Sequence, residues 1–207
     1  MCGSGRFLIP ILENGIDIEG TDASGHMLDN CRKKCAEKNL NPVLYFQKLQ
    51  DMSFKNKYGI VFIPSGSFGL ITEENEINNS LKNIFDCLKQ GGKFLLEIQT
   101  PYSLQDTTII SRKVNRNDFT KIILNSESSF EIRTNIEITI YEYRLVINNE
   151  VTLTESEVIN VKHFYTDEFF DLLKSAGFSD IKALKPYSDK MADKQESMIL
   201  FHCVKQI

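Results

Sequence analysis

The sequence lacks the long apolar run that a membrane-spanning helix needs. None of its segments approaches about 18 consecutive apolar residues, and no basic segment followed by an apolar one opens the chain. We therefore expect a cytoplasmic protein that has no membrane partner.

An excess of basic residues is also missing. Lys and Arg number 24 against 28 Asp and Glu, so the formal net charge is −4 and the sequence pI is near 5.5. Proteins that bind the phosphate backbone of nucleic acids usually carry a basic surface. The charge balance therefore argues against nucleic acid as a partner.

The five cysteines form neither an even set nor a Cys-x-x-Cys pair. They stand at Cys2, Cys31, Cys35, Cys87 and Cys203. Cys31 and Cys35 lie one helical turn apart, but two thiols without further ligands do not make a zinc site. We interpret the cysteines as reduced thiols and predict no metal site.

Length and composition are those of one globular domain. Hydrophobic residues make up 42% of the 207 residues and charged residues 25%, which excludes a disordered chain. At about 150 residues per domain, we predict a single domain over residues 1–207 with one elaboration.

Helix and strand signals alternate over the first hundred residues, which is typical of a parallel α/β sheet. Ser24 can cap one helix and Thr72 another, which Gly91 and Gly92 would end. The apolar run 59–63 suggests a central buried strand. We predict helices over 6–14, from Ser24 to about Cys35 and from Thr72 to about Leu88, and strands over 16–22, 43–46, 59–63 and 93–98.

The pattern changes after Pro101. Residues 104–162 are rich in Ile, Val, Thr and Tyr and contain no convincing helix. The apolar positions change parity near Ile140, which suggests a bulge or a bend there. Asn148-Asn149 suits a tight hairpin turn. We therefore predict an antiparallel β insertion.

The α/β pattern then resumes toward the end of the chain. Thr166 can cap a helix that ends at Gly177, and strands follow over 180–184 and 197–204. The predicted fold class is α/β, a doubly wound, mostly parallel sheet with an antiparallel β insertion.

A glycine loop and an acid form the clearest functional signal. Gly3-Ser4-Gly5 opens a helix, and Asp22 ends the following strand 17 positions after Gly5. Such glycines let the backbone approach a ligand, and an acid so placed can accept both ribose hydroxyls of a nucleoside. Leu8 stands where the dinucleotide fingerprint needs a third glycine, which disfavours nicotinamide and flavin cofactors. The alternative for the loop is a plain tight turn.

These residues belong to a longer series of motifs. The segments 2–10 and 20–28 are followed by Gln50-Asp51-Met52 and by the segments 63–68, 90–93 and 173–178. In this order they resemble the class I S-adenosylmethionine-dependent methyltransferases of small-molecule type. The resemblance covers essentially the whole chain, including the insertion.

The resemblance implies S-adenosyl-L-methionine as cofactor and a set of residues around it. Asp22 would bind the ribose and Asp51 the adenine amino group, although Asp51 also suits an exposed loop and Met27 a core. Residues 65–68 would border the sulfonium and the acceptor. The full implied set is Gly3, Ser4, Gly5, Asp22, Ala23, Met27, Asp51, Met52, Ser65, Ser67 and Phe68.

The same resemblance implies a small-molecule acceptor. Nucleic-acid and protein-glutamine methyltransferases carry Asn/Asp-Pro-Pro-aromatic after the fourth strand, whereas residues 64–68 read Pro-Ser-Gly-Ser-Phe. The insertion over 104–162 would be a lid on the acceptor side. His163 could act there as a base, although a packing histidine is the favoured interpretation. Other candidates near the acceptor are Tyr102, Tyr141, Tyr143 and Tyr165; no catalytic residue and no oligomeric state is predicted.

One departure from the family concerns the start of the sequence. The family has a central strand ahead of the glycine loop, and this sequence begins inside that loop. We expect the strands around Ile18 and Ile60 to flank a gap or to meet directly. The favoured interpretation is a truncated portion of a longer methyltransferase. The alternative is a shortened, non-catalytic relative that binds adenosyl ligands.

Overall fold

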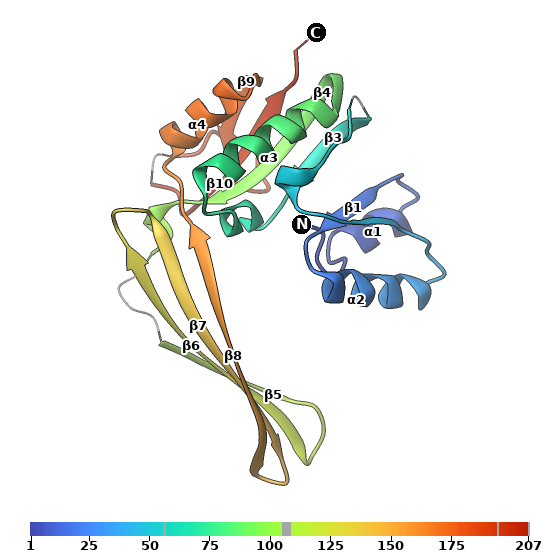
Figure 1. The fold of residues 1–207 in the computed structure, drawn as a ribbon, viewed down its shortest axis with the longest axis vertical. Coiled ribbons are helices and arrows are strands. Elements are labelled where there is room, and N and C mark those ends of the chain that lie inside the picture. The colour runs from blue at the N-terminus through green and yellow to red at the C-terminus, as the bar shows by residue number, and fades with distance from the viewer. Residues whose placement is uncertain (56, 105–108, 194, 207) are drawn as a thin grey trace.

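The computed structural model describes residues 1–55, 57–104, 109–193 and 195–206. An α/β part carries a long antiparallel sheet that projects away from it (Figure 1). None of the helices in the described ranges is long and apolar enough to cross a membrane.

The first part of the chain folds around a two-stranded parallel sheet. Strand β1 (Glu19–Asp22) pairs with β2 (Val43–Phe46), which places Asp22 opposite Phe46 at the carboxyl ends. Helices α1 (Leu8–Glu13) and α2 (Gly25–Ala36) enclose a small core with these strands. Cys31 and Cys35 are fully buried in this core.

A second, mixed sheet has the order β3-β4-β10-β9. Strands β3 and β4 are parallel, and β10 runs antiparallel to both of its neighbours. Helices α3 and α4 cover one face of this sheet (Figure 1). The bounds are Tyr58–Ile63 for β3, Glu74–Cys87 for α3, Leu88–Gln99 for β4, Thr166–Ser175 for α4, Ser179–Leu184 for β9 and Met198–Val204 for β10.

The main hydrophobic core belongs to this second sheet. Strand β4 contributes Phe94, Leu96 and Ile98 to it, at every second position. Successive side chains of a strand point to opposite faces. The side chains of Glu97 and Gln99 therefore lie on the face of β4 away from this core.

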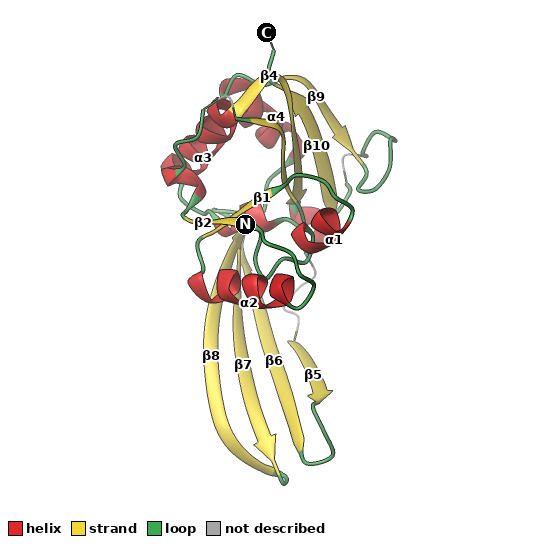
Figure 2. Cartoon of the chain, turned by 90° about the vertical axis from the view of Figure 1, so that its right-hand side faces the viewer, coloured by secondary structure: helices red, strands yellow, loops and turns green. Residues whose placement is uncertain are grey.

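The antiparallel sheet consists of four consecutive strands joined by hairpins (Figure 2). Asn148 and Asn149 have φ of 51° and 67°, which confirms the predicted turn. The α/β fold class with its antiparallel insertion is confirmed. The assignment of residues 104–162 as a lid within a single domain stays a prediction. The strands are β5 (Ile109–Asn115), β6 (Thr120–Glu131), β7 (Ile136–Ile147) and β8 (Glu150–Lys162).

The two α/β sheets are separated where the sequence predicted a gap. Strand β1 pairs only with β2 among the described strands, and β3 forms the edge of its own sheet. The prediction of a central, buried strand over 59–63 is therefore wrong. Ile60 is 59% exposed and lines a groove between the two sheets.

Three predicted boundaries are also corrected. Glu73, not Thr72, precedes the first turn of α3, and this helix ends at Cys87. Gly91 and Gly92 lie inside β4 because their backbone groups bond to Lys205, with Gly91 at φ 71°. In α4 the cap is Tyr165, and Thr166 is the first helical residue.

No bulge interrupts β7 at Ile140. The pairing with β6 is continuous from Ile147 to Ile136, and the register shift toward β8 falls between Leu145 and Val146. Apolar residues change parity because neither face of this sheet is covered along its whole length. Ile140 and Leu153, which face opposite sides, are 52% and 50% exposed.

Candidate functional site

The glycine loop precedes α1 and lies at the carboxyl end of β1. Gly3 and Gly5 have φ of 54° and 86°, in the region that side chains rarely adopt. A Cβ on Gly5 would lie 2.7 Å from the sulfur of Cys31, so this residue packs closely on α2. A Cβ on Gly3 would meet nothing within 4 Å, so the loop presents bare backbone to open space at Gly3.

Asp22 lies directly beside this loop. The amide of Gly3 donates to Oδ2 at 2.7 Å and the amide of Ser24 donates to Oδ1 at 2.9 Å. Each carboxylate oxygen can accept two hydrogen bonds, so one acceptor position on each remains for a ligand diol. The structure thus brings together the loop and the acid that the sequence singled out.

Helix α2 supplies the next group of predicted residues. The hydroxyl of Ser24 accepts a bond from the amide of Met27 and caps the helix, as predicted. Met27 is 47% exposed, which excludes the alternative of a core methionine, and Ala23 is also exposed. Lys34 reaches from α2 to the hydroxyl of Ser4 at 2.9 Å.

The residues predicted to lie beside adenine follow β2, at the turn η1 (Leu49–Asp51). Asp51 is exposed, whereas Met52 is buried in the main core. Asn83 of α3 donates to the carbonyl oxygens of Leu49 and Gln50 and so fixes this turn. No local sequence pattern marks Asn83, because its partners lie more than 30 positions away.

Gln47 is a second residue that sequence reasoning missed. It follows β2, and its amide donates to the carbonyl of Asp22 at 3.1 Å. Its side-chain Nε2 is buried and has no hydrogen-bond partner among the described residues. A buried amide donor without a partner is costly.

The segment after β3 adopts an unusual backbone. Ser65 and Gly66 have φ of 59° and 67° and lead into the turn η2 (Ser67–Leu70). Ser65 is exposed and Ser67 is half-buried, so both remain available to a ligand. The side chain of Phe68 is fully buried against Phe164 and Phe169, so its predicted place beside the cofactor is corrected to the core.

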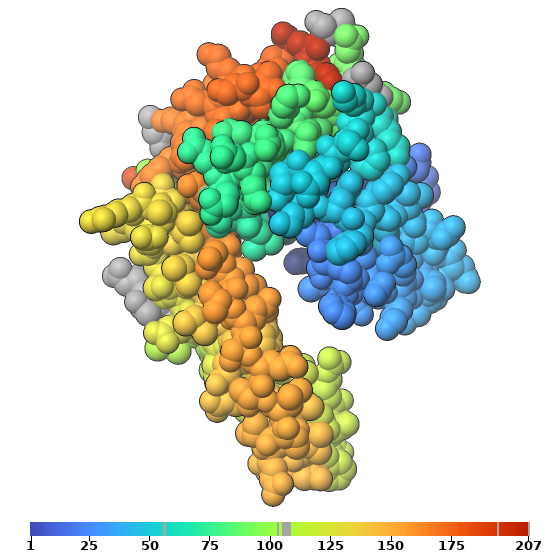
Figure 3. Space-filling view, viewed as in Figure 1, coloured from blue at the N-terminus to red at the C-terminus, as the bar shows by residue number. Residues whose placement is uncertain are grey.

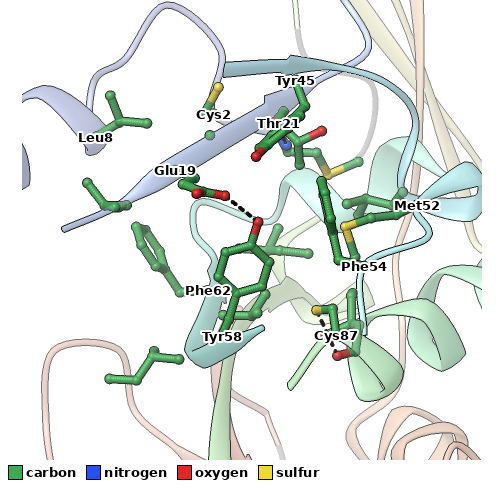
Figure 4. Close-up of a pocket in the computed structure, with 18 of the residues that line it drawn as sticks. Cys2, Leu8, Glu19, Thr21, Tyr45, Met52, Phe54, Tyr58, Phe62 and Cys87 are labelled. Carbon is green, nitrogen blue, oxygen red and sulfur yellow. Dashed lines mark hydrogen bonds between the residues drawn. The ribbon is translucent and has the colours of Figure 1, made fainter. Parts of the chain in front are cut away.

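An apolar groove of about 250 Å³ lies between β1 and β3 (Figure 4). Met52 is the one predicted cofactor residue that lines it. Glu19 spans the groove and accepts bonds from Tyr58 at 2.5 Å and from Lys57 at 2.6 Å. Cys2, Thr21 and Pro64 also line the groove, so it adjoins the site at the carboxyl ends of the strands.

The charges in this groove are mutually satisfied. Burial alone would raise the pKa of Glu19, but bonds from Lys57, Tyr58 and Tyr45 outweigh it and lower that pKa. Burial and the bond to Glu19 raise the pKa of Tyr58. At neutral pH this cluster is therefore an ionised carboxylate bridged to a lysine and a neutral phenol.

The acceptor-side candidates lie in three places. His163 is 1% exposed, with Nδ1 3.1 Å from the carbonyl of Thr100 and Nε2 3.0 Å from Glu137. Both ring nitrogens are engaged, which favours the packing role over the base. Tyr102 and Tyr165 form one edge-to-face pair, and Tyr141 and Tyr143 form a stacked pair on the antiparallel sheet.

Known proteins are similar to this chain in sequence and in fold. A family model described as "Methyltransferase domain" matches residues 1–92. The protein named "Putative methyltransferase YqeM", from Bacillus subtilis (strain 168), is 23% identical over 209 residues, which cover 99% of this chain and 81% of that protein.

Solved structures resemble the whole fold. One is an S-adenosylmethionine-dependent methyltransferase from Clostridium acetobutylicum ATCC 824, with a TM-score of 0.83 and 19% identity over 100% of this chain and 82% of that one. Another is the sugar N-methyltransferase KedS8 from Streptoalloteichus sp ATCC 53650, with a TM-score of 0.82 and 17% identity over 100% and 78%. At these identities the likeness concerns the fold.

Proposed function

We propose that this chain, which belongs to the class I S-adenosylmethionine-dependent methyltransferases, methylates a small molecule bound between η2 and the antiparallel sheet. The observation that carries the cofactor site is the contact between Gly3 and Asp22. It joins the exposed backbone of the glycine loop to a carboxylate at the end of β1.

The residues present fit an adenosyl group. Asp22 keeps acceptor positions for a vicinal diol, and Gly3 leaves room for close approach of a ligand. Gln47 offers a buried donor, and the side chains of Met27 and Asp51 are exposed. In this proposal these residues hold the adenosine, while Ser65 and Ser67 border the reacting end.

The acceptor would occupy the open recess between β8 and the N-terminal unit. Figure 3 shows this recess between the orange strand and the blue segment. Strand β8 packs on η2, since a Cβ on Gly69 would lie 2.6 Å from the carbonyl oxygen of Lys162. The reacting end of the cofactor site and the base of the sheet are thus adjacent. A small molecule also agrees with the Pro-Ser-Gly-Ser-Phe segment and with the sugar that the relative KedS8 methylates.

The chemistry requires little from the protein beyond alignment. When bound, S-adenosylmethionine supplies a methyl group on a sulfonium, which is already activated for in-line displacement. The chain's own residues would orient the two reactants and exclude water. A base is needed only where the acceptor must lose a proton, and the engaged ring of His163 does not supply one.

Calorimetric titration tests the cofactor site directly. The chain should bind S-adenosylhomocysteine and S-adenosylmethionine, and Met27→Ala should weaken both because it removes an exposed wall of the adenine site. Lack of binding to the wild type at millimolar ligand would contradict the proposal.

The acceptor class needs a second measurement. Release of S-adenosylhomocysteine is followed with pools of small-molecule amines, alcohols and thiols, and in parallel with nucleic acid and with unfolded protein. Turnover with a small-molecule pool is the expected result. Turnover with nucleic acid or protein alone would contradict the small-molecule acceptor, and binding without any turnover would favour the non-catalytic alternative.

A further inference from the structure

Glu97 is the one buried carboxylate among the residues that the structure describes. It lies on β4, is 6% exposed and accepts a hydrogen bond from the backbone amide of Ser65 at 2.5 Å. Its neighbours Leu96 and Ile98 point into the main core, so Glu97 lies on the other face of the strand. Burying a carboxylate is unfavourable unless its hydrogen bonds compensate. In the described part of the chain Glu97 has one hydrogen bond, from Ser65, and this burial therefore needs an explanation.

Ser65 is held in a conformation that serine rarely adopts. Its φ of 59° lies in the left-handed region, which glycine tolerates and residues with a Cβ disfavour. Gly66 follows with φ 67°, and a Cβ there would lie 3.0 Å from Gln99. Strained backbone of this kind persists only where the surroundings fix it, and it occurs preferentially at functional sites.

Three long-range contacts fix this segment. Glu97 of β4 accepts a hydrogen bond from Ser65, and Gln99 of β4 lies close to Gly66. Gly69 packs against the carbonyl of Lys162 on β8. Residues 65–69 therefore connect the mixed sheet to the base of the antiparallel sheet. They lie at the reacting end of the proposed cofactor site.

We propose that Glu97 is a positioning residue for methyl transfer. Its carboxylate holds Ser65 in the left-handed conformation and so presents residues 65–67 to the cofactor. A charge-assisted bond is suited to this task because it is stronger than a neutral one. The inference rests on the proposed cofactor site, since Ser65 matters for binding only if it borders that site.

The test compares variants at both ends of this hydrogen bond, with S-adenosylhomocysteine as the probe in calorimetry. Glu97→Leu removes the acceptor and should weaken binding about tenfold or more. Glu97→Gln keeps an oxygen that accepts from Ser65 and should stay within about threefold of wild type. Adding Ser65→Gly to Glu97→Leu should recover much of the affinity, because glycine adopts this φ without a Cβ penalty.

Ile98→Ala is the matched control. It alters the adjacent residue of β4 and removes a side chain that is 1% exposed in the core. This variant should lower the melting temperature while the folded protein keeps wild-type affinity for the probe. A purely structural role of Glu97 predicts that Glu97→Leu behaves like Ile98→Ala, and that result would overturn the inference.

A second route remains if Glu97→Leu does not fold. Ser65→Val leaves Glu97 in place but puts a β-branched residue where φ is 59°. Affinity should again fall about tenfold, and unchanged affinity would overturn the inference. If the wild type itself does not bind the probe, the proposed cofactor site fails. If wild type and all variants bind equally, only the role of Glu97 fails.

Discussion

The two four-stranded sheets of this molecule differ in what covers them. Helices α3 and α4 pack on the mixed sheet, whose strands contribute Phe94, Leu96, Ile98 and Phe201 to the main core. In the described strands of the antiparallel sheet, only Thr139 and Val146 are buried. The mixed sheet is therefore stabilised by side-chain packing. The antiparallel sheet depends on the hydrogen bonds between its strands and on contacts at its base.

This difference indicates that the two sheets contribute unequally to stability. Apolar burial is the main favourable term in folding, so the stability of the whole chain should reside in the mixed sheet and its helices. The antiparallel sheet keeps exposed apolar side chains such as Leu153 and Val158 without a covering layer. Substitutions in the two sheets should thus have very different consequences.

Phe169→Ala should have the largest effect on stability. Its ring is fully buried and contacts Phe68, Phe164 and Phe201 at centroid distances of 4.8 to 5.6 Å. Truncating a buried Phe costs about 3–5 kcal/mol. Urea unfolding measures this loss; a change below about 1 kcal/mol would contradict the assignment of stability to this core.

Asp22→Ala should act on both stability and binding. It removes the acceptor for the amides of Gly3 and Ser24, and hydrogen bonds to charged groups contribute about 1.5–3 kcal/mol. Affinity for S-adenosylhomocysteine should fall about tenfold, which corresponds to about 1.4 kcal/mol.

Asp51→Ala is the control for Asp22→Ala, because Asp51 is exposed. It should change affinity without a comparable loss of stability. Thermal melting and calorimetry on both variants separate the two effects. Equal stability of Asp22→Ala and wild type would show that the carboxylate does not organise the loop.

His163→Leu tests how the antiparallel sheet is anchored. The ring bridges the carbonyl of Thr100 and the carboxylate of Glu137, and leaving buried polar groups unsatisfied costs about 1–3 kcal/mol. Hydrogen exchange should increase in β7 and β8 near Glu137 while α3 stays protected. A uniform increase over the whole chain would mean that the two sheets unfold as one unit.

The smallest effect is expected from Val158→Thr, with Val146→Thr as its matched partner in the same sheet. Val158 is 61% exposed and Val146 is 3% exposed. Surface changes usually stay within about 0.5 kcal/mol, whereas burying a hydroxyl costs about 1–3 kcal/mol. Equal destabilisation would indicate that a further surface covers Val158 in solution.

Local signals in the sequence predicted much of the fold and part of the site. The strand over 93–98, the Ser24 cap and the paired asparagines of the β7–β8 turn all depend on neighbouring residues. The pairing of the glycine loop with Asp22 was also predicted, because consecutive elements of a parallel α/β sheet meet at one edge. The ribose contact itself stays a prediction.

Other features could not be predicted because their partners are distant in the chain. Glu97 acts on Ser65 from 32 positions away, and His163 contacts Thr100 from 63 positions away. The apolar run of β3 suggested a central strand, yet its free edge faces a groove. Phe68 was predicted to lie beside the cofactor, but its ring packs in the core.

The sequence by itself determined the backbone preferences of this protein. Glycine at positions 3 and 5 and asparagine at 148 and 149 each select a local conformation with positive φ. The tertiary structure alone decided which of these conformations carries strain, which edge stays open and which sheet is left uncovered. Those outcomes depend on long-range packing, because hydrogen bonds such as that from Ser65 to Glu97 form only when the sheet brings distant segments together.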